Sequence, residues 1–170
     1  MICFDVSALV KAHLGATLTL DVNFGPQVLT DDSIEDPEAL EVGFLHGSLQ
    51  VVCVQDGLFV QGPLESQLEL ECARCLNSFV FPITLDLAET FRWAEVDQTP
   101  EMPYSISDNG ELDLTSLLRE QTWLTIPMKP LCCPDCKGLC PQCGVNLNIE
   151  SCTCEDEEID PRLAKLKELL

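Results

Sequence analysis

The sequence predicts an α+β fold in which an antiparallel, partly closed β-meander carries one packed helix and a cysteine-rich tail that ends in a short helix. Three observations predict it: hydrophobicity alternates with period two over much of residues 18–91, the period becomes helical from Leu114 onward, and seven of the eleven cysteines follow Leu131. We therefore divide the 170 residues into a β-rich domain with one helix (1–130), a cysteine-rich segment (131–156) and a C-terminal helix (157–170).

The strands are predicted by alternating apolar and polar side chains. In residues 64–72 the even positions are mostly apolar and the odd positions polar, and residues 79–87 alternate similarly. This pattern is typical of strands with one solvated face, and the short linker between the segments predicts a hairpin. Asp56-Gly57 predicts a type I′ turn between two further strands. The N-terminal segment predicts the first strand rather than an export signal, and the acidic segment 31–41 a loop or short helix.

Two helices are predicted. The first is indicated by the helical spacing of Leu114, Leu117, Leu118, Gln121 and Leu124. Asp113 is placed to cap its N-terminus, and it should end before Pro127. The second begins at Asp160-Pro161, an N-cap followed by proline. Its face carries Leu163, Leu166 and Leu170. Because a helix of about ten residues is marginal alone, it must dock on the domain or on a partner.

The chain is strongly acidic, with 29 acidic and nine basic residues and a formal net charge of −20. Binding a phosphate backbone needs clustered lysines and arginines, and here they are scattered, so we do not expect direct RNA binding. The charge favours a basic partner, the alternative being that excess acid serves only solubility. The candidate partner-binding run is Glu155, Asp156, Glu157 and Glu158. No apolar run approaches the ~20 residues that cross a bilayer, so we expect a soluble, cytoplasmic protein.

Eleven cysteines in a reducing cytoplasm favour metal or redox chemistry over a disulfide scaffold. Eight of them form closely spaced pairs: Cys72 and Cys75, Cys132 and Cys136, Cys140 and Cys143, and Cys152 and Cys154. Eight thiols supply two tetrahedral zinc sites. Cys140-Pro141-Gln142-Cys143-Gly144 has the pattern of a zinc-ribbon knuckle, in which glycine permits the positive φ that closes the turn. We therefore expect a zinc-ribbon-like tail with two zinc ions.

The spacing also divides the ligands between the two ions. Because eight residues separate Cys143 from Cys152, Cys152 and Cys154 most simply complete the knuckle's site. Cys132 and Cys136, at i and i+4 of a helical turn, then need two more ligands. The hairpin turn supplies them as Cys72 and Cys75, so that this site would staple the tail to the sheet.

Other uses of the thiols stay open. One zinc with spare thiols, or an iron–sulfur cluster, would also suit the ligand type. A redox CxxC pair is expected at a helix N-terminus after a strand, and neither CxxC pair clearly has that position. We interpret Trp93 and Trp123 as core anchors, with a partner surface as the alternative for Trp93, and we expect the leucines of the first helix, Leu124 included, to pack on the sheet. His13 and His46 are interpreted as ordinary structural or surface residues, and Cys3, Cys53 and Cys133 as small apolar fillers or bystanders. With no nucleophile-and-base motif and no phosphate loop, we do not expect an enzyme.

Several segments taken together carry a family resemblance. They are residues 71–76 and 131–148, Cys152-Thr153-Cys154, the acidic run and Asp160-Pro161-Arg162-Leu163. In combination they resemble the bacterial and plastid YceD family, associated with accumulation of large-subunit ribosomal RNA, over nearly the whole chain. Cys133 departs from the pattern, because Cys133-x2-Cys136 rivals Cys132-x3-Cys136 and either could supply the ligand.

The resemblance implies a role in biogenesis of the large ribosomal subunit. Combined with the acidic charge, it predicts a non-catalytic factor that binds a basic large-subunit ribosomal protein or a pre-ribosomal particle. One alternative is a zinc ribbon that contacts ribosomal RNA directly, for which Arg74 and Lys137 are the best placed cations. A third is a thiol oxidoreductase that uses Cys72 and Cys75.

Overall fold

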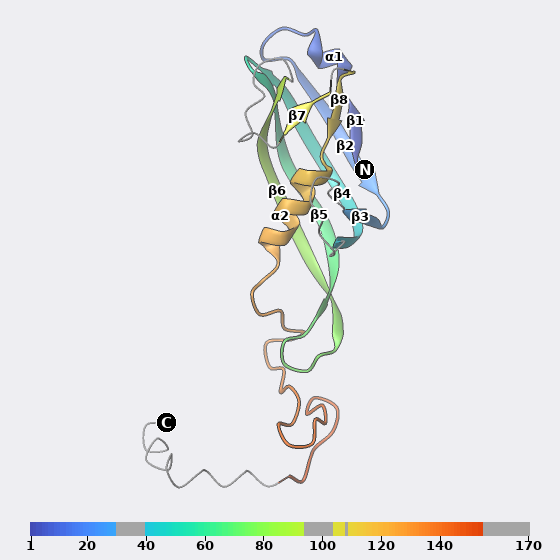
Figure 1. The fold of residues 1–170 in the computed structure, drawn as a ribbon, viewed down its shortest axis with the longest axis vertical. Coiled ribbons are helices and arrows are strands. Elements are labelled where there is room, and N and C mark those ends of the chain that lie inside the picture. The colour runs from blue at the N-terminus through green and yellow to red at the C-terminus, as the bar shows by residue number, and fades with distance from the viewer. Residues whose placement is uncertain (30–39, 94–103, 108, 155–170) are drawn as a thin grey trace, which may run out of the picture.

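The computed structural model describes residues 1–29, 40–93, 104–107 and 109–154 (Figure 1). Its main element is a six-stranded sheet in the order β2-β4-β5-β6-β7, with β3 also paired to β4, and a second sheet pairs β1 with β8. The elements are β1 (Cys3–Asp5), α1 (Ser7–Val10), β2 (Thr17–Phe24), β3 (Gln27–Leu29), β4 (Leu40–Val54), β5 (Gly57–Glu71), β6 (Ser78–Trp93), β7 (Ser105–Ile106), β8 (Glu111–Asp113) and α2 (Thr115–Thr125). The predicted C-terminal helix and most of segment 31–41 lie outside the described residues.

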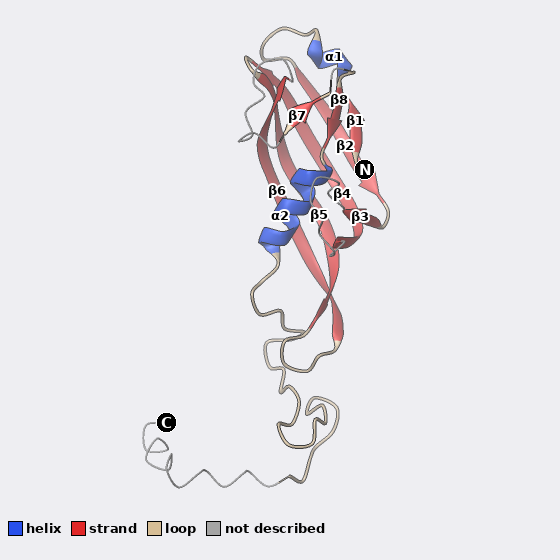
Figure 2. Cartoon of the chain, in the orientation of Figure 1, coloured by secondary structure: helices blue, strands red, loops and turns tan. Residues whose placement is uncertain are grey.

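Three long consecutive strands form the predicted meander. β4 pairs antiparallel with both β2 and β5, and β5 pairs with β6 from Gly57↔Arg92 to Glu71↔Ser78. The predicted hairpin between residues 64–72 and 79–87 is therefore confirmed. The hairpin extends beyond α2, and its turn lies at the end of the sheet nearest the cysteine-rich segment, which continues past it (Figure 2). The strands thus carry this turn away from the core and toward the tail.

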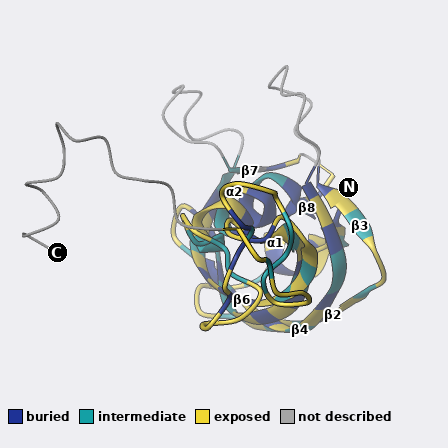
Figure 3. Cartoon of the chain, turned by 90° about the horizontal axis from the view of Figure 1, so that it is seen from below, coloured by how far each residue is buried: buried dark blue, intermediate teal, exposed yellow. Residues whose placement is uncertain are grey.

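Two features of the sheet differ from the prediction. β7 pairs parallel with β6, at Arg92↔Ser105, so the sheet is mostly but not wholly antiparallel. Its strand order is open, and the sheet curves without closing into a barrel (Figure 3). The N-terminal segment forms β1, the short helix α1 and then β2, and the Asp5 carboxylate accepts the N–H of Ser7 (2.9 Å) where β1 gives way to α1. The first strand is thus short and belongs to the second sheet.

The turn between β4 and β5 lies one residue before its predicted position. Val54 and Gly57 form the last pair, so Gln55 and Asp56 make the turn. Gly57 is not among the glycines with positive φ, yet a Cβ built on it would lie 1.9 Å from the backbone oxygen of Phe91. The close approach of β6, rather than the turn, therefore requires glycine at this position.

The core lies between the inner face of the sheet and α2, which crosses it (Figure 1). Leu114, Leu117 and Leu118 are fully buried against the inward leucines and valines of the long strands. The carboxylate of Asp113 accepts the N–H of Thr115 (2.8 Å), which satisfies a free amide at the helix start, as predicted, although Leu114 holds the N-cap position itself.

The buried side of α2 is rotated from the predicted one at its C-terminal end. Thr115, Leu118 and Thr122 are buried, at helical spacing, and Thr122 donates its hydroxyl to the carbonyl of Leu118. Because Thr122 faces the sheet, Trp123 and Leu124 point away from it and are 40% and 78% exposed. The predictions that placed these two side chains in the core are wrong.

The outer face of the sheet is polar and acidic. Its residues alternate with buried ones along each strand and share cross-strand rows such as His46↔Glu65↔Thr84. Its exposed acids are Asp21, Glu41, Glu65, Glu69, Glu71 and Asp86. Within strands β2 to β6 the basic side chains are only His46 and Arg92. Among the described residues, no helix has the length and apolar character needed to span a membrane.

Candidate metal centres

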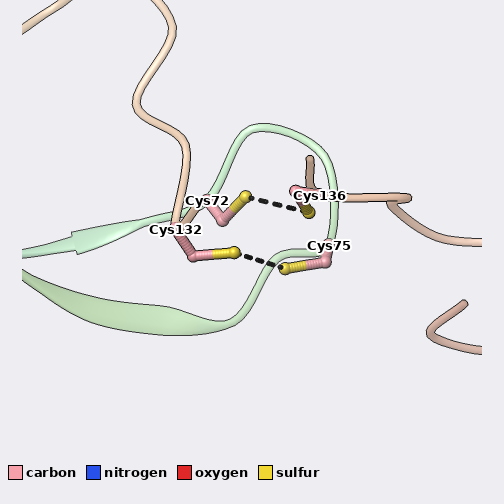
Figure 4. A group of neighbouring side chains, drawn as sticks. All are labelled: Cys72, Cys75, Cys132 and Cys136. Atoms are coloured by element: carbon pink, nitrogen blue, oxygen red, sulfur yellow. Dashed lines mark hydrogen bonds between the residues drawn. The ribbon is translucent and has the colours of Figure 1, made fainter. Parts of the chain in front are cut away.

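The first cysteine cluster comprises Cys72, Cys75, Cys132 and Cys136. Cys72 follows the last residue of β5 and Cys75 lies in the turn before β6, whereas the other two come from the loop after α2. Their four sulfur atoms face one another (Figure 4). The Sγ–Sγ distance is 3.8 Å between Cys72 and Cys136 and 3.7 Å between Cys75 and Cys132. The hairpin turn and the tail thus meet at a common point.

The second cluster comprises Cys140, Cys143, Cys152 and Cys154. In each cluster the four sulfur atoms lie within 4.8 Å of one another. A tetrahedral ion with metal–sulfur bonds of about 2.3 Å would hold its sulfurs about 3.8 Å apart, which matches the distances in the first cluster. Both clusters could therefore hold a metal ion, and the structure groups the eight cysteines as their spacing predicts.

The two CxxC turns have the same backbone geometry. In both, the N–H of the first cysteine donates to the carbonyl five residues later, and the residue after the second cysteine donates back to the first cysteine, at 2.8 to 3.0 Å. That residue has positive φ in both, 58° at Leu76 and 73° at Gly144. The positive φ predicted for Gly144 is confirmed, and Leu76 adopts the same conformation without being glycine.

Backbone amides in these turns favour the thiolate form of the first cysteine. The amide of Cys132, followed by amides of the turn, lowers the pKa of Cys72 to about 6. The amides of Cys143 and Gln142 lower the pKa of Cys140 to about 6 in the same way. Because a thiolate is the form of cysteine that binds a metal, these amides prepare each site for a cation.

The first cluster is built into the end of the sheet. Cys72, Cys75 and Cys136 are 0 to 3% exposed and pack against Phe79 and Leu131. Backbone bonds join the turn to the tail, from Ala73 N–H to Pro130 (2.8 Å) and from Leu139 N–H to Arg74 (3.1 Å). In the second cluster Cys140 is 5% exposed, whereas Cys143 and Cys154 are exposed. The two sites therefore differ in their link to the fold.

The structure places Arg74 and Cys133 beside the first cluster. From the sequence, Arg74 was a possible RNA contact and Cys133 a rival ligand to Cys132. Arg74 donates through Nη1 to the carbonyl of Cys136 (2.8 Å), so its guanidinium holds the tail. Cys133 is exposed, and its sulfur lies 3.9 Å from that of Cys132, which is the member of the cluster. Cys132 and Cys136 flank an irregular turn rather than a helical one, closed by the N–H of Cys136 on Cys133 (3.2 Å).

Asn148 connects the second loop to the first cluster. Its Oδ1 accepts the N–H of Lys137 (2.8 Å), and its Nδ2 donates to the sulfur of Cys136 (3.3 Å). Burial would raise the pKa of Cys136, but this bond and the amide of Gly138 lower it below the ordinary value. Our reading of the sequence did not assign Asn148 a role, because an asparagine in a loop has no spacing that marks it.

We expect Asn148→Ala to loosen the tail, because it removes the donor to Cys136 and the acceptor for Lys137. A hydrogen bond to a charged group contributes about 2 kcal/mol, so hydrogen exchange at the Lys137 amide should speed by roughly thirtyfold. Ile149→Ala is the matched control, since Ile149 is the next residue and is 73% exposed. Equal exchange rates in the two variants would contradict this role.

Among the described residues, the remaining candidates other than Lys137 belong to neither cluster and do not contact one. Glu155, Asp156, Glu157 and Glu158 lie outside the described residues. His13, His46 and Cys3 are exposed, Cys53 is buried in the core, and Trp93 is half-buried against it. Lys137 is exposed.

Comparison with known proteins gives one matching family model. It is described as large ribosomal RNA subunit accumulation protein YceD and matches residues 60–170, which include all eight cysteines of the two clusters. No solved structure matches this chain.

Several relatives are similar in sequence. An uncharacterized protein of Mycobacterium tuberculosis, Rv2926c, is 32% identical over 94% of this chain and 84% of its own length. The uncharacterized protein YlbN of Bacillus subtilis is 29% identical over 63% of each chain. A chloroplastic protein of Arabidopsis thaliana, named large ribosomal RNA subunit accumulation protein YCED homolog 1, is 26% identical over 78% of this chain and 31% of its own.

Proposed function

The chain belongs to the YceD family of large ribosomal RNA subunit accumulation proteins, and from this premise we propose that it is a non-catalytic, cytoplasmic factor in biogenesis of the large ribosomal subunit. The family name implies a role in accumulation of the subunit's RNA. The observation that carries the rest is the pair of four-cysteine clusters. A shell of four cysteines leaves no position for water or substrate, which suits a structural metal rather than a catalytic one.

The metal that we propose is zinc, one ion in each cluster. Zinc favours four thiolates in a tetrahedron, and the sulfur spacing of the first cluster agrees with that geometry. Its chemistry here would be to hold chain segments together. In the first site it would join the hairpin turn to the loop after α2, and in the second it would fold residues 140–154 on themselves.

Elemental analysis of the purified protein should give close to two zinc ions per chain. Cys143→Ser should lower this to about one ion, because the first cluster keeps its four ligands. Mass spectrometry under native conditions measures both values. Metal-free protein with unchanged thermal stability would contradict the assignment, and iron with visible absorption would favour the iron–sulfur alternative.

We propose that the partner is a basic protein of the large subunit. The support is the acidic outer face of the sheet, the net charge of −20 and the two further negative charges that each zinc with four thiolates would carry. A surface of this sign attracts basic proteins and repels a phosphate backbone. The rival function, a zinc ribbon that contacts RNA, is disfavoured because Arg74 is engaged with Cys136.

Association with the basic partner should be fast at low ionic strength and slow as salt screens charges beyond a Debye length of about 8 to 10 Å. Surface plasmon resonance with purified basic large-subunit proteins and with large-subunit RNA compares the two classes directly. If the acidic run docks, charge reversal at residues 155–158 should lower the association rate further. Tight RNA binding without any protein partner would favour the rival function.

A further inference from the structure

A groove of about 310 Å³ opens on the outer face of the sheet, where β3, β4, β5 and β6 lie side by side. Val28 and Val80 line it and are 48% and 60% exposed, although they are apolar. The groove also contains the carboxylates of Glu41 and Glu69, both exposed. None of the described residues that line it is a lysine or arginine. It therefore combines apolar walls with negative charge.

A β-bulge accounts for the hollow. Val42 pairs with Leu68 but Leu45 pairs with Ser66, so β4 has one extra residue at this point. A bulge bends its strand and interrupts the cross-strand rows of side chains. Gly43 lies in the bulge, where a Cβ would approach within 2.7 Å of the Gln67 side chain. Because Gly43 has no side chain, the side chain of Gln67 can lie over the backbone of β4. No side chain from residue 43 then fills the groove.

The walls of the groove define the chemistry of an occupant. Exposed valines favour an apolar side chain, because burying it removes apolar surface from water. Carboxylates on both β4 and β5 favour lysine or arginine on either side of that side chain. An RNA backbone would meet only repulsion here.

We propose that this groove docks a basic segment of a large-subunit ribosomal protein, with an apolar side chain of that segment between Val28 and Val80 and its cations against Glu41 and Glu69. The inference rests on the proposed function, because it names the surface through which the proposed partner binds. It places the docking surface on the sheet rather than on the acidic run at residues 155–158.

The test measures affinity for purified basic proteins of the large subunit, one at a time, by biolayer interferometry. The groove variant is Glu41→Lys with Glu69→Lys. Its matched control is Asp21→Lys with Asp86→Lys, which reverses two exposed acids of the same face outside the groove. Both change the net charge equally, so a general field effect is the same in each. We expect the groove variant to lose at least about tenfold more affinity than the control.

A second pair of variants tests the apolar walls without changing charge. Val80→Thr keeps the branched shape and strand preference but replaces a methyl group by a hydroxyl. We expect it to lower affinity by roughly tenfold, the lower end of the range for a lost methyl contact in an apolar pocket. Val10→Thr, at a 42% exposed valine of α1, should leave affinity unchanged. Circular dichroism and thermal melts establish that each variant is folded.

The outcomes separate this inference from the proposed function. If the unaltered protein binds a basic large-subunit protein but the groove and control variants weaken equally, or neither weakens, the groove is not the docking surface and the proposed function stands. If charge reversal at residues 155–158 abolishes binding while the groove variants bind normally, the tail is the docking surface instead. If the unaltered protein binds none of these proteins at low salt, the proposed partner and the groove assignment both fall.

Discussion

Cys72→Ser should lower the stability of the whole β domain, whereas Cys143→Ser should unfold only the tail. Cys72 is fully buried in the cluster that joins the hairpin turn to the loop after α2, and Cys143 is exposed in the outer cluster. Structural zinc contributes roughly 10 kcal/mol of apparent binding free energy in small modules, so the loss of one site should be easy to measure. We expect Cys72→Ser to lower the midpoint of thermal unfolding by about ten degrees or more.

The comparison needs both a global and a local measurement. Scanning calorimetry reports unfolding of the sheet, and hydrogen exchange at residues 137–150 reports opening of the tail. Cys133→Ser is the control for the first site, because Cys133 is exposed and adjacent to Cys132 without belonging to the cluster. Equal calorimetric shifts for Cys72→Ser and Cys143→Ser would show that the two sites are not divided as we describe.

Gly57→Ala should destabilise the central hairpin as strongly as a core defect. A Cβ at residue 57 would lie 1.9 Å from the backbone oxygen of Phe91 and 2.8 Å from its carbonyl carbon, so β5 and β6 would have to separate at this end of their ladder. Overpacking of this kind costs about 1 to 3 kcal/mol, and contact with backbone places the expected value at the upper end.

Urea unfolding followed by far-UV circular dichroism gives the change in the free energy of unfolding. The matched control is Gly25→Ala, since a Cβ at residue 25 meets nothing within 4 Å and its φ is not positive. Gly25→Ala should leave stability unchanged to within about 0.5 kcal/mol, or raise it slightly by restricting the unfolded chain. A Gly57→Ala protein as stable as the Gly25→Ala protein would mean that the strands absorb the extra methyl group.

The sequence predicts those features whose physical cause is local. Alternation in residues 64–72 predicts a strand because odd- and even-numbered side chains of a strand point to opposite faces of the sheet. The pairing of β5 with β6 follows from the short linker between them. Cysteine spacing predicts the two clusters because ligand geometry allows few groupings of eight thiols. Asp113 at the start of α2 is another local signal.

Features that depend on contacts between distant segments cannot be predicted from a short stretch of sequence. The two-residue strand β7 pairs parallel with β6 although nothing in Ser105–Ile106 indicates it. Trp123 and Leu124 are exposed because Thr122 occupies the buried position, a choice made by the fit of α2 to the sheet. Gly57 resembles a turn residue, but it is required by β6, whose Phe91 is more than thirty residues away in sequence. The bulge after Val42 and the hydrogen bond from Asn148 to Cys136 likewise depend on how separate segments pack together.

The separation of the first cluster's ligands along the chain sets the order in which the molecule can be completed. Cys72 and Cys136 are 64 residues apart, and β6 and α2 lie between them. Closing so long a loop early is entropically costly, so the hairpin and helix that shorten its effective length should form first. Synthesis runs from the N-terminus, which means that the growing chain presents two of the four ligands long before the other two exist. With zinc in this cluster, as we propose, metal capture would be a late event in folding, because a partly synthesised chain would lack two of the four cysteines.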